Sequence, residues 1–143
     1  YSQPGLDLAR SITKSPVFGI QDAGVLSAMA LADLFGVIAV AEASIPRHLS
    51  NLRRLGVDHR LAGEVALEGN VSVADSGHGE ESYGLLLRSA AKLRNLGAGA
   101  IVLGCAGMSG HRKRLEEEVG CPVIDPTQAA VAMAFGMLAT ASP

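Results

Sequence analysis

The sequence predicts an α/β fold with a mainly parallel sheet, and three observations support this prediction. Short apolar runs alternate along the chain with segments of helical periodicity, the pattern of parallel layer folds. Aromatic residues make up only 3% of the chain and Trp is absent, so small aliphatic side chains have to fill the core. Such a core suits helices packed closely on a sheet better than a β-sandwich. A chain of 143 residues is long enough to bury it as one domain.

Four apolar runs have the length and the flanking turn residues of buried strands. They comprise residues 16–20, 35–41, 100–103 and 122–125. A fifth candidate strand is Val71-Ser72-Val73, within the less regular stretch 57–80. With the helices that follow the four runs, the layout is one strand-loop-helix unit used four times.

Helical periodicity follows each of the four runs. Asp22 and Ser44 are placed to cap the first two helices, and Gly56 to end the second. The last helix starts at Asp125 and is apolar nearly all round over 129–139, so we expect another layer or segment to bury it. The other two predicted helices are residues 81–96 and 109–119.

Charge, hydropathy and cysteine usage exclude several function classes. The net charge of −2 gives no basic surface for nucleic acid. No apolar run approaches the roughly 20 residues that cross a bilayer, and YSQPGLDLAR lacks the pattern of a signal peptide. The four histidines and two cysteines show no metal-ligand spacing, so we expect no metal and place each histidine at the surface. Two thiols make no disulfide scaffold, and we expect a cytoplasmic location.

Ligands of parallel sheets bind at the carboxyl ends of the strands, where helix N-termini also point. The residues that directly follow the predicted strands are therefore candidates for a binding site. They are Gln21, Asp22, 42–44, 104–109 and 125–127.

Cys105 is the strongest of these candidates for chemistry. It follows a predicted strand, lies between Gly104 and Gly107, and precedes a predicted helix N-terminus. Glycines let the backbone approach a ligand closely, and a helix N-terminus lowers the pKa of a thiol. A thiolate in this place can act as a nucleophile or transfer a proton; the alternative is an ordinary buried core cysteine. Cys121 starts a predicted strand, and we expect it to be structural.

The charged run HRKRLEEE at 111–118 is typical of a solvated helix face with ion pairs four residues apart. The three possible pairs are Arg112–Glu116, Lys113–Glu117 and Arg114–Glu118. One hypothesis is that Arg112 and Lys113 raise the electrostatic potential around Cys105 and an anionic substrate.

Several segments together resemble a known family. IVLGCAGMS at 101–109, followed by PVIDPTQAAV at 122–131, is similar to the aspartate/glutamate/hydantoin racemase superfamily, closest to its hydantoin and allantoin racemase branch. FGVIAVA resembles the strand that opens the second half of those enzymes, and PVFGIQDAG resembles the strand-helix step that ends their first half. YSQPGLDLAR resembles the segment that follows the first-half catalytic cysteine. The similarity spans essentially the whole chain, and Gly-Cys-Ala-Gly-Met is its most specific part.

The resemblance implies a parallel-sheet α/β fold of flavodoxin-like three-layer units in two pseudo-symmetric halves. Residues 1–33 would end the first half and residues 34–125 would form the second half with the catalytic cysteine. Residues 126–143 would then form a C-terminal helix that packs back on the first half. The family also implies a homo-oligomer that works on a small molecule without a cofactor.

The family chemistry uses two cysteines, one from each half, on opposite faces of a carbon acid. One thiolate removes the proton and the other thiol donates one to the opposite face. Cys105 matches the second-half cysteine, and the backbone N–H groups of Ala106 and Gly107 match those that hold the substrate's oxygen atoms. By the same resemblance, Tyr1, Ser2 and Val40 are expected to contact the substrate.

Some residues depart from the family pattern. The first-half cysteine would lie just before Tyr1, which predicts that the chain is the C-terminal part of a two-domain enzyme. Ala39 and Val40 stand where many relatives carry hydroxyl groups, and Pro126 where hydantoin racemases commonly have Gly. The expected activity is racemisation of a 5-substituted hydantoin, allantoin or an acidic amino acid. Two alternatives stay open: a single-cysteine decarboxylase similar to the aryl-malonate enzymes, and a non-catalytic α/β binding domain.

Overall fold

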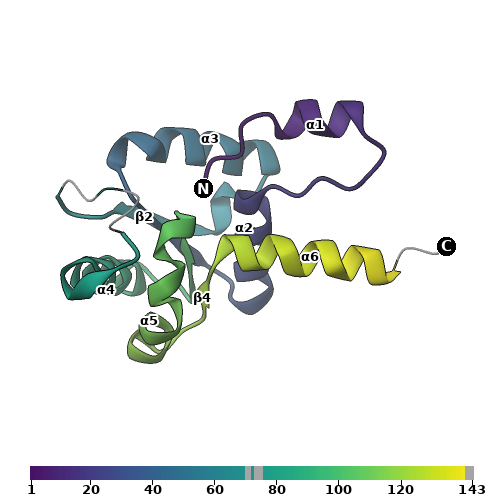
Figure 1. The fold of residues 1–143 in the computed structure, drawn as a ribbon. Coiled ribbons are helices and arrows are strands. Elements are labelled where there is room, and N and C mark those ends of the chain that lie inside the picture. Colours follow the sequence, from purple (N-terminus) through teal and green to yellow (C-terminus); the bar gives the residue numbers. More distant parts are fainter. Residues whose placement is uncertain (70–71, 73–75, 141–143) are drawn as a thin grey trace.

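The computed structural model describes residues 1–69, 72 and 76–140. Within these residues the centre is a parallel sheet of four strands in the order β2-β1-β3-β4, with helices over both faces (Figure 1). The strands are β1 (Phe35–Ala39), β2 (Leu61–Ala66), β3 (Ala100–Leu103) and β4 (Val123–Ile124). All the strand pairings are parallel, so the predicted α/β fold is confirmed.

β1 and β3 form the middle of the sheet. Every residue of both strands is buried, and a continuous apolar run is what a parallel strand covered on both faces requires. The two strands pair with Val37 beside Val102. Successive side chains point to opposite faces of the sheet. Ile101 packs with α4 and α5 on one face, and Val102 packs with α2 and α3 on the other.

The helices lie in two layers, with α3 above the sheet and α4 and α5 below it in the view of Figure 1. The α-helices are α1 (Leu6–Ile12), α2 (Ile20–Leu31), α3 (Ile45–Leu55), α4 (Gly79–Asn95), α5 (Arg112–Val119) and α6 (Pro126–Thr140). Three short 3-10 helices also occur, η1 (Glu42–Ser44), η2 (Asp58–Arg60) and η3 (Ala106–His111).

β2 is a strand that the apolar pattern does not predict. It lies at the edge of the sheet, is only half-buried along its length, and places Glu64 beside Val37 of β1. Gly63 and Glu64 interrupt its apolar run, so the sequence resembles a loop at this point. Val71 and Val73 of the fifth candidate strand lie outside the described residues.

The prediction of a strand at residues 16–20 is wrong. This segment joins no sheet in the described part of the chain, and it leads directly into α2 at Ile20. A strand needs a hydrogen-bonded neighbour along its backbone. Here a side chain from the preceding helix takes that place, since Nε of Arg10 donates to the carbonyl oxygen of Val17 at 3.2 Å.

Two predicted helix caps are also wrong. Asp22 lies inside the first turn of α2 and does not cap it. Gln3 supplies the cap instead, because its Oε1 accepts the N–H groups of Gln21 and Asp22 at 3.1 and 3.3 Å. Ser44 stands directly before α3, but its hydroxyl donates to the carbonyl oxygen of Ala41. A cap that is distant in sequence leaves no local pattern to recognise.

Other helix ends follow the sequence. Gly56 ends α3 with a φ of 76°, a left-handed conformation that favours glycine. Oδ1 of Asp125 accepts the N–H groups of Thr127 and Gln128 at 2.8 and 3.3 Å, so the predicted cap of the last helix is confirmed. The helix predicted at 109–119 begins later, because η3 occupies its first residues.

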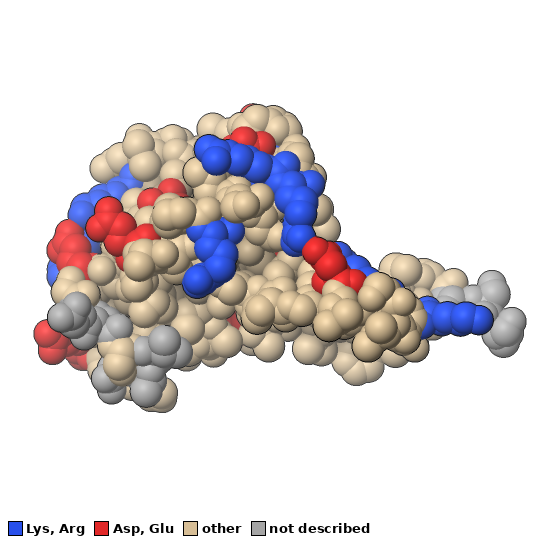
Figure 2. Space-filling view, turned by 90° about the horizontal axis from the view of Figure 1, so that it is seen from above, with Lys and Arg blue, Asp and Glu red and all other residues tan. Residues whose placement is uncertain are grey.

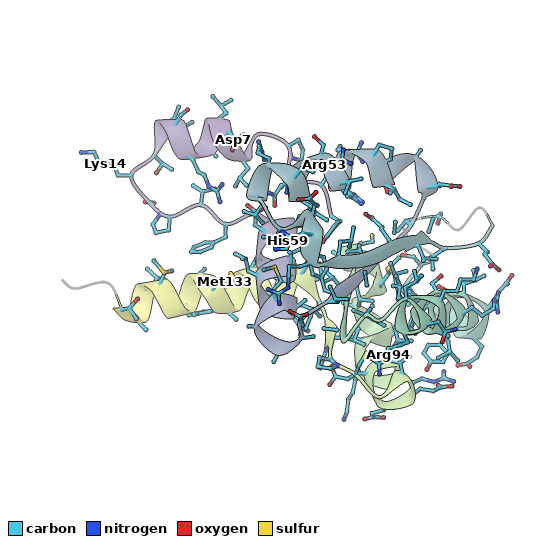
Figure 3. All side chains as sticks on the ribbon, turned by 180° about the vertical axis from the view of Figure 1, so that it is seen from behind. Asp7, Lys14, Arg53, His59, Arg94 and Met133 are labelled. Atoms are coloured by element: carbon cyan, nitrogen blue, oxygen red, sulfur yellow. The ribbon has the colours of Figure 1, made fainter. Side chains whose placement is uncertain are left out.

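The burial expected for the last helix is present only over its first turns in the described part of the chain. α6 packs its first turns against α2, where Gly24 allows close approach to Pro126, and then extends away from the sheet (Figure 1). Figure 3 shows Met133 on this extended part. Its exposed large apolar side chains are Val131, Phe135, Met137 and Leu138. None of the described helices is both long and apolar enough to cross a membrane.

α1 is held mainly by charged side chains. Figure 2 shows basic and acidic residues side by side on the upper surface, and Figure 3 places Asp7 on α1 near the end of α3. Arg54 of α3 pairs with Asp7 at 2.5 Å, and Arg10 of α1 pairs with Asp22 at 3.6 Å. Exposed ion pairs contribute at most about 1 kcal/mol each, so α1 is among the less firmly held helices.

Candidate active site

The carboxyl ends of β1 and β3 bring Cys105 into place. The N–H group of Gly104 donates to the carbonyl oxygen of Ile38 at 2.7 Å, which extends the pairing of the two strands by one residue. A Cβ atom on Gly104 would lie only 2.4 Å from that oxygen, so the position requires glycine. The chain then continues into Cys105, which shares a core cluster with Val40 on the α4 and α5 face.

Cys105 is buried, with 8% of its surface exposed. Its backbone is extended and its carbonyl oxygen accepts the N–H group of Met108 at 3.1 Å, which closes the first turn of η3. The structure therefore has a 3-10 helix where the sequence predicts the start of an α-helix. The α-helix α5 begins only at Arg112.

The two residues after Cys105 carry free donors. Neither the N–H group of Ala106 nor that of Gly107 donates to another residue in the described part of the chain. Both groups belong to the first turn of η3, where no partner within the helix is possible. Ala106 is exposed and Gly107 is half-buried, so a ligand can reach this turn. Donors of this kind can stabilise negative charge on an oxygen atom.

A second loop supports the turn that follows Cys105. Gly77 lies so close to Gly107 that a Cβ on Gly77 would come within 1.7 Å of the Gly107 carbonyl oxygen. Gly110 approaches the same loop, with a virtual Cβ 3.0 Å from the Gly77 oxygen. Two backbones in contact leave little freedom to either, so this packing fixes the orientation of the Gly107 peptide.

Polar groups surround the far end of η3. Burial, and secondarily the electrostatic influence of Arg114 and then His78, lower the pKa of His111. Its Nε2 is buried and has no hydrogen-bond partner among the described residues. The guanidinium of Arg114 lies 3.7 Å from the centre of the Tyr83 ring and pairs with Glu80 at 2.6 Å. The imidazole is thus favoured in its neutral form next to the cysteine loop.

One of the predicted helix ion pairs is confirmed. Arg112 binds Glu116 at 3.0 Å and also donates to the carbonyl oxygen of Val123 at 3.2 Å. Arg114 does not pair with Glu118, because the Tyr83 ring and Glu80 draw it toward α4. The cation of Arg112 is therefore engaged by α5 and β4.

Tyr1 and Ser2 lie over the opposite face of the sheet from Cys105. Tyr1 packs against the core cluster of α2 and α3, and its ring meets the His48 ring edge-on with centroids 4.9 Å apart. Oγ of Ser2 accepts a hydrogen bond from Nε of Arg47 at 2.7 Å. The structure thus brings Val40, Ala106 and Gly107 close to Cys105 in the fold, and Tyr1 and Ser2 close to α3.

Two hollows lie near these residues. Ser2 lines one of about 640 Å³, between the first residues of the chain, α2 and α3. Val40 lines another of about 760 Å³, at the ends of β1 and β2. Cys105 lines neither of the two.

Other candidates from the sequence have structural roles. Gln21 is buried and donates from Nε2 to the carbonyl oxygen of His48 at 3.1 Å, and Asp125 is the cap described above. Cys121 is buried, and burial raises the pKa of its thiol, as expected of a structural cysteine. Within residues 1–69, 72 and 76–140, no three His, Cys, Asp or Glu side chains gather so that they could hold a metal ion.

Sequence reasoning missed a buried pair, His48 of α3 and Glu64 of β2. Nδ1 of His48 lies 2.5 Å from Oε1 of Glu64, and the two side chains are only 3% and 1% exposed. The prediction of a surface histidine is therefore wrong at this position. The signal was present: His48 follows Ile45 by three residues and precedes Leu52 by four, which is the spacing of one helix face.

Comparisons with known proteins identify the family of the chain. The model of the Asp/Glu/Hydantoin racemase family matches residues 1–134. The chain belongs to this family. It is 35% identical to a hydantoin racemase of Paenarthrobacter aurescens over 97% of its own length and 59% of the relative's. It is 37% identical to a hydantoin racemase of Rhizobium meliloti over 96% of its length and 57% of the relative's.

A solved allantoin racemase has the same fold. An allantoin racemase from Klebsiella pneumoniae superposes with a TM-score of 0.85 and 32% identity, over 95% of this chain and 56% of that one. The chain therefore spans less than two thirds of the length of the racemases it matches.

Proposed function

We propose that the complete protein is a racemase of a small carbon acid and that Cys105 is one of its two proton-transferring groups. The observation that carries the proposal is the position of Cys105: a buried thiol directly after β3, followed by two free N–H groups, in a family whose relatives include hydantoin and allantoin racemases. Family membership alone does not identify the residue that transfers the proton. The geometry favours Cys105 over the capping and packing residues around it.

The proposed reaction moves one proton off a carbon atom and another onto it. A thiolate takes the hydrogen next to the substrate carbonyl, and the electron pair of the C–H bond passes to the carbonyl oxygen to give an enolate. The N–H groups of Ala106 and Gly107 stabilise that oxygen, and one such donor typically contributes 10²- to 10³-fold in rate. A thiol on the other face then donates its proton to carbon, so thiol and thiolate exchange roles and the centre is inverted.

The second thiol is proposed to come from a part of the protein beyond the 143 residues, because the related racemases are longer than this chain. The buried Cys121 is not proposed for this role, since it lies at the opposite end of the sheet's strands from Cys105. No cofactor enters the proposed mechanism, because a thiol pair is sufficient to move the proton.

The substrate contacts are proposed for Val40, Tyr1 and Ser2. Val40 lies beside Cys105 in the same cluster, and Ser2 lines a hollow at the start of the chain. We propose a 5-substituted hydantoin or allantoin ahead of an acidic amino acid, because the relatives named above are hydantoin and allantoin racemases. The exposed apolar side chains of α6 are proposed to pack on the first half of the complete protein. A homo-oligomer and a cytoplasmic location remain predictions.

Racemisation by the full-length protein tests the proposal. One enantiomer of each candidate substrate is followed by optical rotation with wild type, Cys105→Ser and the matched control Cys121→Ser. We expect wild type and the Cys121 variant to racemise a hydantoin or allantoin and the Cys105 variant to lose at least about 10³-fold in kcat. Wild-type turnover in Cys105→Ser would exclude this role for the thiol. Release of carbon dioxide from a malonate without racemisation would indicate the decarboxylase alternative.

A further inference from the structure

The buried pair of His48 and Glu64 has no role in the mechanism above. It joins α3 to the edge strand β2, with both side chains almost fully enclosed. Placing two ionisable groups in the interior costs desolvation free energy, and apolar residues of similar volume would often stabilise the fold as well or better. The pair is therefore better explained by what it orients than by a gain in stability.

The group that the pair meets is Tyr1. The edge-on contact of the Tyr1 and His48 rings places the phenol among the buried polar groups, and its hydroxyl has no hydrogen-bond partner in the described residues. Oε2 of Glu64 is likewise buried and unpartnered. Burial raises the pKa of Tyr1, and the nearby carboxylates of Glu64 and Asp22 raise it further. Tyr1 thus keeps its proton, and its hydroxyl is a hydrogen-bond donor near the unpartnered Oε2 of Glu64.

The neighbouring residues hold the same segment. Arg47, next to His48 on α3, donates to Ser2 at 2.7 Å. Gln3 caps α2, and Gln21 at the start of α2 donates to the backbone of His48. Each of the first three residues is therefore held by α2 or α3, and His48 contacts both the Tyr1 ring and the Gln21 side chain.

We propose that His48 and Glu64 are positioning residues that hold Tyr1, and through it Ser2, at the edge of the substrate site. Glu64 fixes the imidazole of His48 through Nδ1, and the ring of Tyr1 meets that imidazole edge-on. This inference rests on the proposed function, in which Tyr1 and Ser2 contact the substrate. Neither His48 nor Glu64 touches the reacting atoms.

Two substitutions in the full-length protein separate the roles of the pair. His48→Phe keeps a ring but removes the hydrogen bond to Glu64, and Glu64→Gln keeps the shape but removes the charge. Controls are His59→Phe and Glu117→Gln, the same changes at exposed positions; Figure 3 shows His59 in the turn before β2. The readouts are kcat and KM for the racemised substrate, amide hydrogen exchange over residues 2–6 without substrate, and the melting temperature. In this segment the N–H group of Leu6 donates to the carbonyl oxygen of Gln3 at 3.4 Å.

We expect His48→Phe to lower kcat/KM by about tenfold and to speed exchange over residues 2–6 to a similar extent. A displacement of about 1 Å in a site can lower the rate by about 100-fold, so a tenfold loss corresponds to a modest displacement. Glu64→Gln should cost about threefold, since the amide still bonds to the ring. The double variant should be no worse than His48→Phe alone, because the two residues act as one unit. The controls should behave as wild type.

A purely structural role predicts a different result. A lower melting temperature with unchanged kcat/KM and unchanged exchange over residues 2–6 overturns the proposal. If His48→Phe does not fold, Glu64→Gln decides the question on the same readouts. If wild type racemises nothing, the proposed function fails, and the exchange measurement still decides whether the pair holds the first residues of the chain.

Discussion

The amide nitrogen of Gly104 lies 2.7 Å from the carbonyl oxygen of Ile38, one residue beyond the paired part of β3. This hydrogen bond directs the chain toward Cys105 and leaves no room for a side chain, since a Cβ would be 2.4 Å from the same oxygen. The position of the thiol is therefore set by the two central strands of the sheet.

Gly104→Ala should displace the cysteine loop and destabilise the protein. A methyl group facing a backbone oxygen cannot be accommodated by a side-chain rotation, so we expect a loss of about 2–3 kcal/mol in the free energy of unfolding. Urea unfolding of the full-length protein measures it, and the rate of Cys105 alkylation by iodoacetamide reports on the loop. Wild-type values for both would show that the close approach of the strands is not required.

Gly77→Ala should impair activity more than stability. The added methyl would meet the Gly107 carbonyl oxygen at 1.7 Å, so the peptide that presents the Gly107 N–H group has to move. We expect kcat/KM to fall by about tenfold or more. The matched control is Gly84→Ala in α4, whose Cβ would meet nothing closer than the Arg88 guanidinium at 3.6 Å. Equal kcat/KM for the two variants would contradict the proposed support of the loop.

Asp125→Ala should destabilise the protein by about 1 kcal/mol through loss of the α6 cap. Asp125 directly follows β4, where a ligand-binding role was also possible from the sequence. Asp125→Asn keeps an acceptor for the Thr127 and Gln128 N–H groups, and we expect it to retain most of the stability and all of the activity. Loss of activity in Asp125→Asn at unchanged stability would assign the carboxylate to the site instead.

His111 should make the protein less stable in mild acid. Burial, and then Arg114 and His78, lower its folded-state pKa below the ordinary 6.5, while the Glu80 carboxylate partly opposes this. The unfolded chain therefore binds the proton first, and the free energy of unfolding falls as pH drops from above 6.5 toward the lowered value. Urea midpoints at about pH 7.5 and 5.5 should differ less in His111→Gln than in wild type. His59→Gln, at an exposed position, should keep the wild-type difference; an equal change in both variants would rule out His111 as the cause.

The sequence predicts the central strands and the cysteine loop well because their residues interact locally or are apolar throughout. β1 and β3 are continuous apolar runs, and Cys105 directly follows Gly104, a glycine that the close backbone contact with Ile38 requires. β2 escapes prediction because an edge strand does not need an apolar run. The Gln3 cap and the His48–Glu64 pair escape it because their partners are distant in sequence, and no local pattern records such a contact.

The most direct test of the central claim is deuterium exchange at the stereocentre. Each enantiomer of the racemised substrate is incubated in D₂O with full-length Cys105→Ser, and proton NMR follows the loss of the signal. If Cys105 serves one face and a second group serves the other, one enantiomer should exchange its hydrogen without inversion and the other should remain unlabelled. Exchange of both enantiomers with inversion at the wild-type rate would contradict the assignment of Cys105.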